Sequence, residues 1–266
     1  MTSKQESFSY VNGINSISQC LARQAGFIKT ESPYIRHKIT DLYVMKEKES
    51  DRINNILVNS KKYNVKVHKI YEREFNQLLK EARIDNADGY HQGMIAKVVD
   101  INPLPFQDVK IDKLNSMFVV LDGITDPHNL GAIIRTAAFY GCSGVLVPED
   151  KSAKFSASVF KVASGGFEFV PLFYVANLPK TVAILKQFGK TIIGLSEHSD
   201  KELSLTAGSI DLSSTALVIG SEQSGIRPAI KSICDNWLKL EGVNKLSLNA
   251  SVAFSIAATR LFEAKK

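Results

Sequence analysis

Four short apolar runs in the C-terminal half of the chain constrain its fold more than any other feature of the sequence. Stretches with helical periodicity follow them at 130–140, 153–163 and 249–264. Apolar strands that alternate with helices are typical of a parallel sheet covered on both faces. We therefore predict an α/β domain whose ligands bind beyond the carboxyl ends of the strands. The four runs are Phe118-Val-Val-Leu, Gly144-Val-Leu-Val, Thr191-Ile-Ile-Gly-Leu and Ala216-Leu-Val-Ile-Gly.

The N-terminal part of the chain has the pattern of a separate, smaller αβ unit. Its predicted elements are helices at 14–24 and 51–61 and strands at 41–45, 65–68 and 95–99. Pro103 and Pro105 come next, and prolines disfavour both a helix interior and a central strand. We expect a first domain at 1–100, a linker at 101–115 and a second domain at 116–266.

Composition argues against several classes of protein. The chain has 266 residues, of which 44% are hydrophobic, so it can bury a core and is not globally disordered. No apolar run approaches the roughly 20 residues that span a bilayer, and residues 1–5 lack the apolar stretch of a secretory signal. Cys20, Cys142 and Cys234 form no CxxC pair, which argues against a disulfide framework or a structural zinc site. We expect a cytoplasmic protein with no membrane segment.

The net charge of +6 hints at a polyanionic partner. Residues 1–113 carry 18 basic and 14 acidic side chains, which give a net charge of +4, and the remainder of the chain carries +2. Charge alone does not decide between a nucleic-acid-binding surface and an ordinary solvated one. That choice depends on the loops that follow the apolar runs.

The first apolar run continues into Asp122-Gly-Ile-Thr-Asp-Pro-His-Asn-Leu-Gly-Ala-Ile-Ile-Arg. Pro127 and Gly131 bracket a sharp entry into a helix, and Asn129 is expected to be its N-cap. Arg135 lies six residues further along, among apolar or small neighbours. Taken alone, such an arginine is more often an ion-pair member or a snorkelling side chain than a catalytic group.

Two further polar segments follow apolar runs. In Gly220-Ser-Glu-Gln-Ser-Gly, two glycines five residues apart predict a tight loop whose backbone can approach a ligand closely. The segment is neither GxGxxG nor a P-loop, and Glu222 has the alternative role of a helix cap. In Leu246-Ser-Leu-Asn-Ala-Ser-Val-Ala, Ser247 and Asn249 stand at a predicted helix start, where capping is the simplest function.

In this order and spacing, the three polar segments resemble the SpoU (TrmH-type) family of RNA ribose 2′-O-methyltransferases. The likeness covers residues 120–264. The N-terminal half resembles the small RNA-binding domain that precedes the catalytic domain in many members. The matching segments are, in chain order, 11–17, 91–96, 121–137, 217–226 and 247–253.

The resemblance implies features that periodicity does not. It implies an α/β catalytic domain of the SPOUT type, whose C-terminal segment threads into a trefoil knot. Pattern reading alone would not predict such a knot, because knots are very rare in protein chains. The resemblance further implies S-adenosylmethionine as the methyl donor and a homodimer with the site near the subunit interface.

By the same resemblance, Arg135 acts on the ribose 2′-hydroxyl. One role is that of a base assisted by an RNA phosphate. The other is to orient the ribose and stabilise negative charge, which suits a guanidinium because its pKa lies above about 12. Asn129 is expected to place Arg135 or the substrate, and Glu222 to organise the loop and contact Asn129 or Arg135. Ser247 and Asn249 are expected near the active site and the donor.

Four positions match the family's donor-binding backbone. They are Gly220, Leu240, Leu248 and Leu195. Members usually carry Ile-Pro-Met before the third segment, whereas this chain has Leu240-Glu241-Gly242. We therefore expect a donor pocket that differs in detail but an active enzyme. The resemblance implies no metal, and none of the five histidines has the pattern of a metal ligand.

The expected substrate is a guanosine ribose in large-subunit ribosomal RNA, because the two-domain layout resembles the members that act there. One alternative is the same chemistry on transfer RNA or on an antibiotic-resistance site of ribosomal RNA. Transfer-RNA members usually replace the N-terminal domain by terminal extensions, which disfavours the first of these. Another alternative, of a different class, is a catalytically silent RNA-binding protein that retains the knot.

Overall fold

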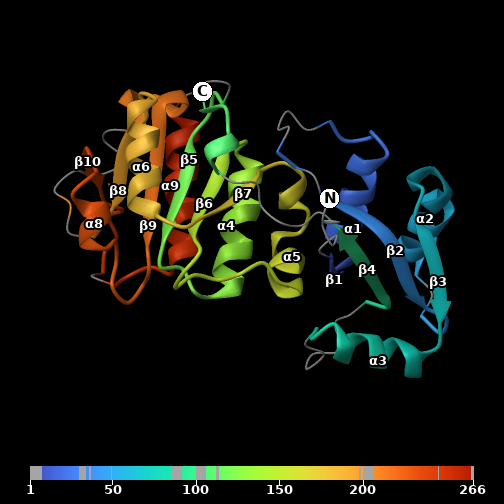
Figure 1. Cartoon of the computed structure of the whole chain (residues 1–266). Helices are drawn as coiled ribbons and strands as arrows, with labels where there is room; N and C mark the ends of the chain where they lie inside the picture. The colour runs from blue at the N-terminus through green and yellow to red at the C-terminus, as the bar shows by residue number, and fades with distance from the viewer. Residues whose placement is uncertain are drawn as a thin grey trace, which may run out of the picture. The chain divides into compact units, whose positions relative to one another are not determined.

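The computed structural model divides the chain into two compact units (Figure 1). The first contains Met1–Asn102 and Phe155–Phe169, and the second contains Pro103–Lys154 and Val170–Lys266. The structure describes residues 8–29, 34–35, 37–48, 50–84, 92–99, 106–111, 114–197, 199, 207–244 and 246–264. Among these residues, no helix has both the length and the apolar character that crossing a membrane requires.

The second unit is built on a six-stranded parallel sheet, which confirms the predicted α/β fold. The order of its strands is β10-β8-β9-β5-β6-β7. Every residue of β5 and β6 is buried, as expected for strands with helices on both faces. The strands are β5 (Phe118–Asp122), β6 (Gly144–Pro148), β7 (Leu172–Val175), β8 (Thr191–Leu195), β9 (Thr215–Gly220) and β10 (Asn236–Leu238).

Helices α4 and α9 pack against one another in the second unit. Tyr140 follows α4, and its hydroxyl lies 2.7 Å from Oγ1 of Thr259 on α9. Its ring also stacks on Phe262, with the ring centroids 5.0 Å apart. These contacts join the C-terminal ends of α4, which carries the first polar segment, and α9, which begins within the third. The α-helices described in this unit are α4 (Pro127–Phe139), α6 (Leu178–Gln187), α8 (Pro228–Lys231) and α9 (Ala250–Glu263).

The first unit contains a four-stranded sheet in the order β1-β4-β2-β3. Strand β4 is antiparallel to both of its neighbours, and β2 and β3 are parallel. Helix α3 was not predicted, although Glu74 accepts a hydrogen bond from the backbone N–H of Tyr71 at its start. The elements are β1 (Phe8–Asn12), α1 (Ile14–Gln24), β2 (Lys38–Met45), α2 (Asp51–Ser60), β3 (Lys66–Ile70), α3 (Glu72–Glu81) and β4 (Met94–Val99).

Residues 155–169 group with the first unit, although they lie between β6 and β7 of the second in the sequence. They form α5 (Ala157–Ala163) and the short 3-10 helix η4 (Gly166–Glu168). The buried Ser16 hydroxyl of α1 donates a 2.7 Å hydrogen bond to the carbonyl of Phe160. This grouping differs from the expected continuous second domain at 116–266. Of the expected linker at 101–115, residues 106–111 and 114–115 are described, and the others lie outside the described residues.

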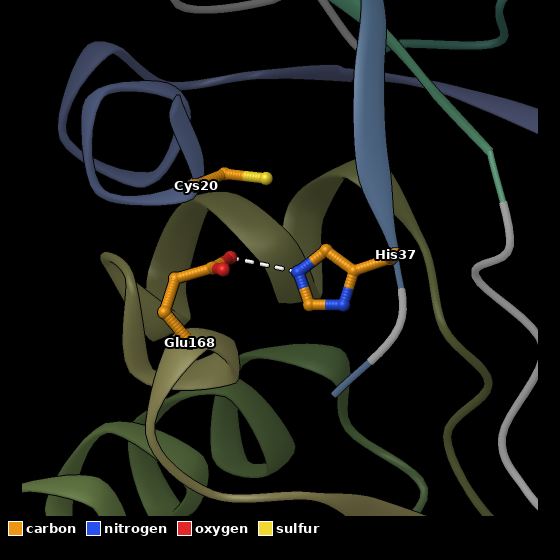
Figure 2. Close-up of side chains that lie close together, drawn as sticks. All are labelled: Cys20, His37 and Glu168. Atoms are coloured by element: carbon orange, nitrogen blue, oxygen red, sulfur yellow. Dashed lines mark hydrogen bonds and ion pairs between the residues drawn. The ribbon is translucent and has the colours of Figure 1, made fainter. Parts of the chain in front are cut away.

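A buried carboxylate holds this segment within the first unit (Figure 2). Glu168 is fully buried, and its Oε1 lies 2.7 Å from Nε2 of His37. Its Oε2 forms an ion pair with Nε of Arg23, and Nη2 of the same arginine donates to the backbone carbonyl of His37. Burial acts to raise the pKa of Glu168, but His37 and Arg23 outweigh it and hold that pKa below its ordinary value.

Cys20 completes a group of three potential metal ligands with His37 and Glu168, whose ligand atoms lie within 4.8 Å of one another. Burial raises the pKa of the Cys20 thiol well above its ordinary value, so the thiol is protonated at neutral pH. Nη2 of Arg23 lies 4.0 Å from the sulfur, and the guanidinium already neutralises the carboxylate. We interpret the group as an ion-pair network in which Arg23 is the cation.

Candidate active site

The candidate site lies where two neighbouring strands of the parallel sheet end. Asp122 is the last residue of β5 and pairs in register with Gly220, the last residue of β9. The first polar segment leaves Asp122 and the second leaves Gly220, so both begin at the same edge of the sheet. This is the edge at which parallel α/β sheets bind ligands.

The loop after β9 is tight, as the spacing of its glycines predicts. The backbone N–H of Gly225 donates a 2.8 Å hydrogen bond to the carbonyl of Ser221, and the two residues form an isolated β-bridge. A Cβ on Gly220 would lie 2.2 Å from the carbonyl carbon of Gly225, which no side chain can accommodate. Gly225 has a φ of +63°, a left-handed conformation that favours glycine.

An ion pair between a buried carboxylate and a half-exposed arginine fastens the far end of this loop to β5. Asp122 is fully buried, and its Oδ2 accepts a 2.7 Å hydrogen bond from the backbone N–H of Arg227. Its Oδ1 accepts from Nε of the same arginine at 2.6 Å. Sequence reasoning missed this pair, because an aspartate at a strand end and an arginine 105 residues later carry no joint signal.

The N-cap of α4 is Asp126 and not Asn129, so that prediction was wrong. Oδ1 of Asp126 accepts a 2.9 Å hydrogen bond from the backbone N–H of His128, and Pro127 occupies the first helical position. The helix therefore begins before Asn129, which lies inside its first turn. Since Asp126 already caps the helix, the amide of Asn129 can bond elsewhere.

Glu222 joins the three polar segments. Its Oε1 accepts hydrogen bonds from Nδ2 of Asn129 at 2.8 Å and from Nδ2 of Asn249 at 3.3 Å. The backbone N–H of Ala250 donates to the same oxygen at 3.0 Å. Nδ2 of Asn249 also donates to Oδ1 of Asn129 at 2.9 Å. We call Asn129, Glu222 and Asn249 the polar cluster.

Asn249 both caps α9 and belongs to the polar cluster. Its Oδ1 accepts from the backbone N–H groups of Ser251 at 3.0 Å and Val252 at 3.3 Å. The capping role predicted for this residue is thus confirmed, and it leaves the amide nitrogen for Glu222 and Asn129. The Glu222 carboxylate gains further from its place at the positive end of the helix.

Arg135 and Ser247 are not joined to the polar cluster. Arg135 is exposed on α4, and within the described part of the chain it has no hydrogen-bond or ion-pair partner. The expected contact of Glu222 is therefore made with Asn129 and not with Arg135. Ser247 is exposed just before α9 and likewise has no hydrogen-bond partner among the described residues.

A cavity of about 530 Å³ opens over the polar cluster. This volume lies within the range of about 300–1,000 Å³ typical of small-molecule sites. All three residues of the polar cluster line it, together with the cations Lys151 and Arg227 and the carboxylates Asp122 and Asp126. Since both signs of charge line the cavity, it suits a polar group of a substrate.

Three of the four expected donor-binding positions lie at the carboxyl ends of adjacent strands. Leu195 ends β8 and pairs in register with Leu238, the last residue of β10. Gly220 ends β9, and Leu240 comes two residues after β10. Leu248 lies before α9 and is 44% exposed. Apolar side chains and backbone groups at one sheet edge suit the adenosine part of a donor.

Comparison with known proteins identifies the family. Residues 116–259 match the family described as SpoU rRNA Methylase. The chain belongs to this family. The predicted resemblance is thus confirmed over more than half of the sequence, and the match includes the whole polar cluster.

Relatives match both halves of the chain. The 23S rRNA (guanosine-2'-O-)-methyltransferase RlmB of Vibrio cholerae is 34% identical over 234 residues, 85% of this chain and 88% of that protein. The protein of the same name from Vibrio parahaemolyticus is 32% identical over 96% of this chain and 95% of its own. The SpoU methyltransferase AviRb from Streptomyces viridochromogenes, solved in complex with AdoMet, has the same fold. Its TM-score is 0.72 at 19% identity, and the match covers 96% of this chain and 90% of that chain.

Proposed function

We propose that this protein transfers a methyl group from S-adenosylmethionine to the ribose 2′-hydroxyl of a guanosine in large-subunit ribosomal RNA. The single observation that carries the proposal is the polar cluster, because it joins all three polar segments at the carboxyl ends of β5 and β9. Family membership and the activity named for relatives that match most of the chain support it.

The donor side of the site is assigned to Leu195, Gly220, Leu240 and Leu248. The leucines offer apolar contact to an adenine ring, and Gly220 offers its backbone. When bound, S-adenosylmethionine supplies an electrophilic methyl group on a sulfonium. The segment from Leu240 to Gly242 departs from the usual family pattern, so we expect its contacts with the donor to be particular to this chain.

On the RNA side, the 2′-hydroxyl is a poor acid, so its oxygen must be aligned and its developing negative charge stabilised. We assign that task to Arg135, whose guanidinium is exposed and has no partner among the described residues. A guanidinium stays protonated at neutral pH, which favours a role in holding an RNA phosphate and orienting the ribose over a role as base. We assign the polar cluster to orienting the loop around the ribose, and Ser247, which is exposed just before α9, to the vicinity of the donor.

The first unit is proposed to bind RNA, since it carries most of the excess positive charge. Residues 1–113 hold +4 of the net +6. We propose a cytoplasmic location, which ribosomal RNA as the substrate supports. No step of the proposed reaction uses a metal.

The second unit is proposed to form a homodimer through α4 and α9. Phe139 on α4 is 82% exposed and Val252 on α9 is 45% exposed, on two helices that pack together. We also propose the trefoil knot of the SPOUT type for the C-terminal segment. In support, the chain adds β10 outside β8 and then returns to α9, which contacts β9.

The test is methyl transfer from labelled donor to separate pools of ribosomal and transfer RNA, followed by mapping of alkali-resistant linkages. Label at a guanosine of large-subunit ribosomal RNA is the expected result. Label confined to transfer RNA would overturn the substrate assignment, and label at an antibiotic-resistance site would redirect it. No label in either pool would identify a catalytically silent RNA-binding protein.

A further inference from the structure

One face of the four-stranded sheet in the first unit gathers aromatic and basic side chains. Residues that pair across neighbouring strands project on the same face of a sheet. One row of pairs runs Tyr10, Lys97, Asp41 and Lys66 across all four strands. The next row contains Tyr43 and its partner His68.

The aromatic rings on this face form a continuous ladder. Phe8 meets Tyr10 edge to face with ring centroids 5.6 Å apart, and Tyr10 meets Tyr43 in the same way at 5.9 Å. The ring of Tyr43 stacks on that of His68 with centroids 4.7 Å apart. We call Phe8, Tyr10, Tyr43 and His68, with Lys66 and Lys97, the aromatic face.

Part of this sheet face enters the core. Met45 and Ile95 lie there in a buried cluster with Phe75 of α3, and Tyr10 and Tyr43 pack against that cluster. Elsewhere on the face, Phe8 is 50% exposed, the His68 side chain is 41% exposed and Lys66 is exposed. Phe8 and His68 are therefore the two rings open to contact from outside the unit, and each lies against one of the core-packed tyrosines.

The charge of the aromatic face complements a polyanion. Nζ of Lys97 lies 4.3 Å from the centroid of the Phe8 ring, and Lys66 stands at the opposite end of the same row. The one carboxylate in that row, Asp41, accepts a 2.9 Å hydrogen bond from Nε2 of His68. The lysines thus outnumber the carboxylate, and its oxygen is already engaged.

We propose that the aromatic face binds unpaired bases of the substrate RNA, with Lys66 and Lys97 on the neighbouring phosphates. Flat rings beside cations on a four-stranded sheet are the arrangement on which single-stranded RNA stacks its bases. A duplex could not stack on these rings, since its bases are already stacked on each other. The inference rests on RNA as the substrate and adds where in the first unit, and in what state, the RNA is held.

The test uses the full chain and a fluorescent, mixed-sequence RNA of about 12 nucleotides, a length suited to sites of about 4–16 nucleotides. It is offered once as a single strand and once as a blunt duplex. The variant Phe8→Ala/His68→Ala removes two partly exposed rings. Phe27→Ala is the matched control, since Phe27 is 63% exposed and also meets a tyrosine edge to face, but lies outside the aromatic face. Circular dichroism checks that each variant folds.

The double variant should bind the single strand at least about tenfold more weakly, because each lost stack weakens binding by a factor of this order. Its affinity for the duplex, and that of Phe27→Ala for either RNA, should change less than about twofold. Unchanged single-strand affinity of the double variant would overturn the inference and indicate another occupant, such as a protein. Equal losses for single strand and duplex, or an equal loss in the control, would overturn it as well.

Turnover separates this inference from the proposed function. The double variant should methylate ribosomal RNA with a raised KM for RNA and an unchanged kcat at saturation. Normal methylation by the wild type together with normal RNA binding by the double variant would refute RNA binding by the aromatic face and leave the proposed function unaffected. Absence of methylation by the wild type would refute the proposed function, whatever the variant binds.

Discussion

Glu168 should be among the most sensitive positions for stability, although it lies in a connection between two strands. The change Glu168→Gln keeps the shape of the side chain but removes the charge that pairs with Arg23 and His37. Glu168 is fully buried, and the Arg23 side chain is only 13% exposed, so solvent screens the loss little. Removing one partner of a buried ion pair lowers the free energy of unfolding by about 3–5 kcal/mol. This is a large part of the roughly 5–15 kcal/mol free energy of unfolding of a typical domain.

Urea unfolding measures this loss with two probes. Far-UV circular dichroism reports both units, whereas the fluorescence of Trp237, the only tryptophan of the chain, reports β10 of the second unit. The dichroism transition of Glu168→Gln should move to lower urea, and its thermal midpoint should fall by about 10 °C. Glu72→Gln is the control, because Glu72 is exposed on α3 and should shift stability by less than about 0.5 kcal/mol.

The stability that Glu168 contributes should decrease as the pH falls. Because the pKa of Glu168 is lowered in the folded protein, its contribution is fully present above the unfolded pKa of about 4.3 and is lost as pH falls through the folded pKa. The difference between wild type and Glu168→Gln should therefore be constant near neutrality and shrink in acid. A variant within about 0.5 kcal/mol of wild type at pH 7 would refute the ion-pair interpretation.

Three other predictions concern the candidate site. Arg135→Ala should abolish methyl transfer while S-adenosylmethionine still binds in calorimetry. The control Lys180→Ala, which removes an exposed cation on α6, should change neither methyl transfer nor donor binding. Loss of donor binding in Arg135→Ala would mean that the role assigned to Arg135 is wrong. Gly220→Ala should weaken donor binding at least about tenfold, because the added Cβ would lie 2.2 Å from the backbone of the loop. In the control Gly208→Ala the added Cβ has no neighbour within 4 Å, so this variant should bind the donor normally. Asp122→Asn should destabilise the second unit by about 1–3 kcal/mol, measured by Trp237 fluorescence in urea, since it removes the charge that holds the half-exposed Arg227 side chain to β5; an unchanged midpoint would contradict this role of the ion pair.

The apolar runs predicted the central part of the second sheet well. All four coincide with β5, β6, β8 and β9, because a strand buried on both faces must be apolar along its whole length. The strands β7 and β10 were missed. The burial of β7 alternates and β10 has only three residues, so neither carries a continuous apolar pattern. Helix α6 was also missed, although Asn177 caps it and a proline follows in its first turn.

The site was predicted as three segments, and the structure explains how they meet. The sequence placed Asn129, Glu222 and Asn249 in loops after strands, which is a matter of local pattern. It could not show that one carboxylate oxygen serves all three, because this depends on β5 and β9 being neighbours. The Asp122–Arg227 pair escaped prediction for the same reason.

By itself, the sequence determined the family, the parallel sheet and the segments that form the site. Each of these depends on patterns of residues that lie close together along the chain. The tertiary structure alone decided that residues 155–169 belong to the first unit. No local pattern reveals that Glu168 is paired with Arg23 and His37, which come more than 130 residues earlier. A charge in the interior is stable only beside its partner, and which partner it finds is a property of the fold.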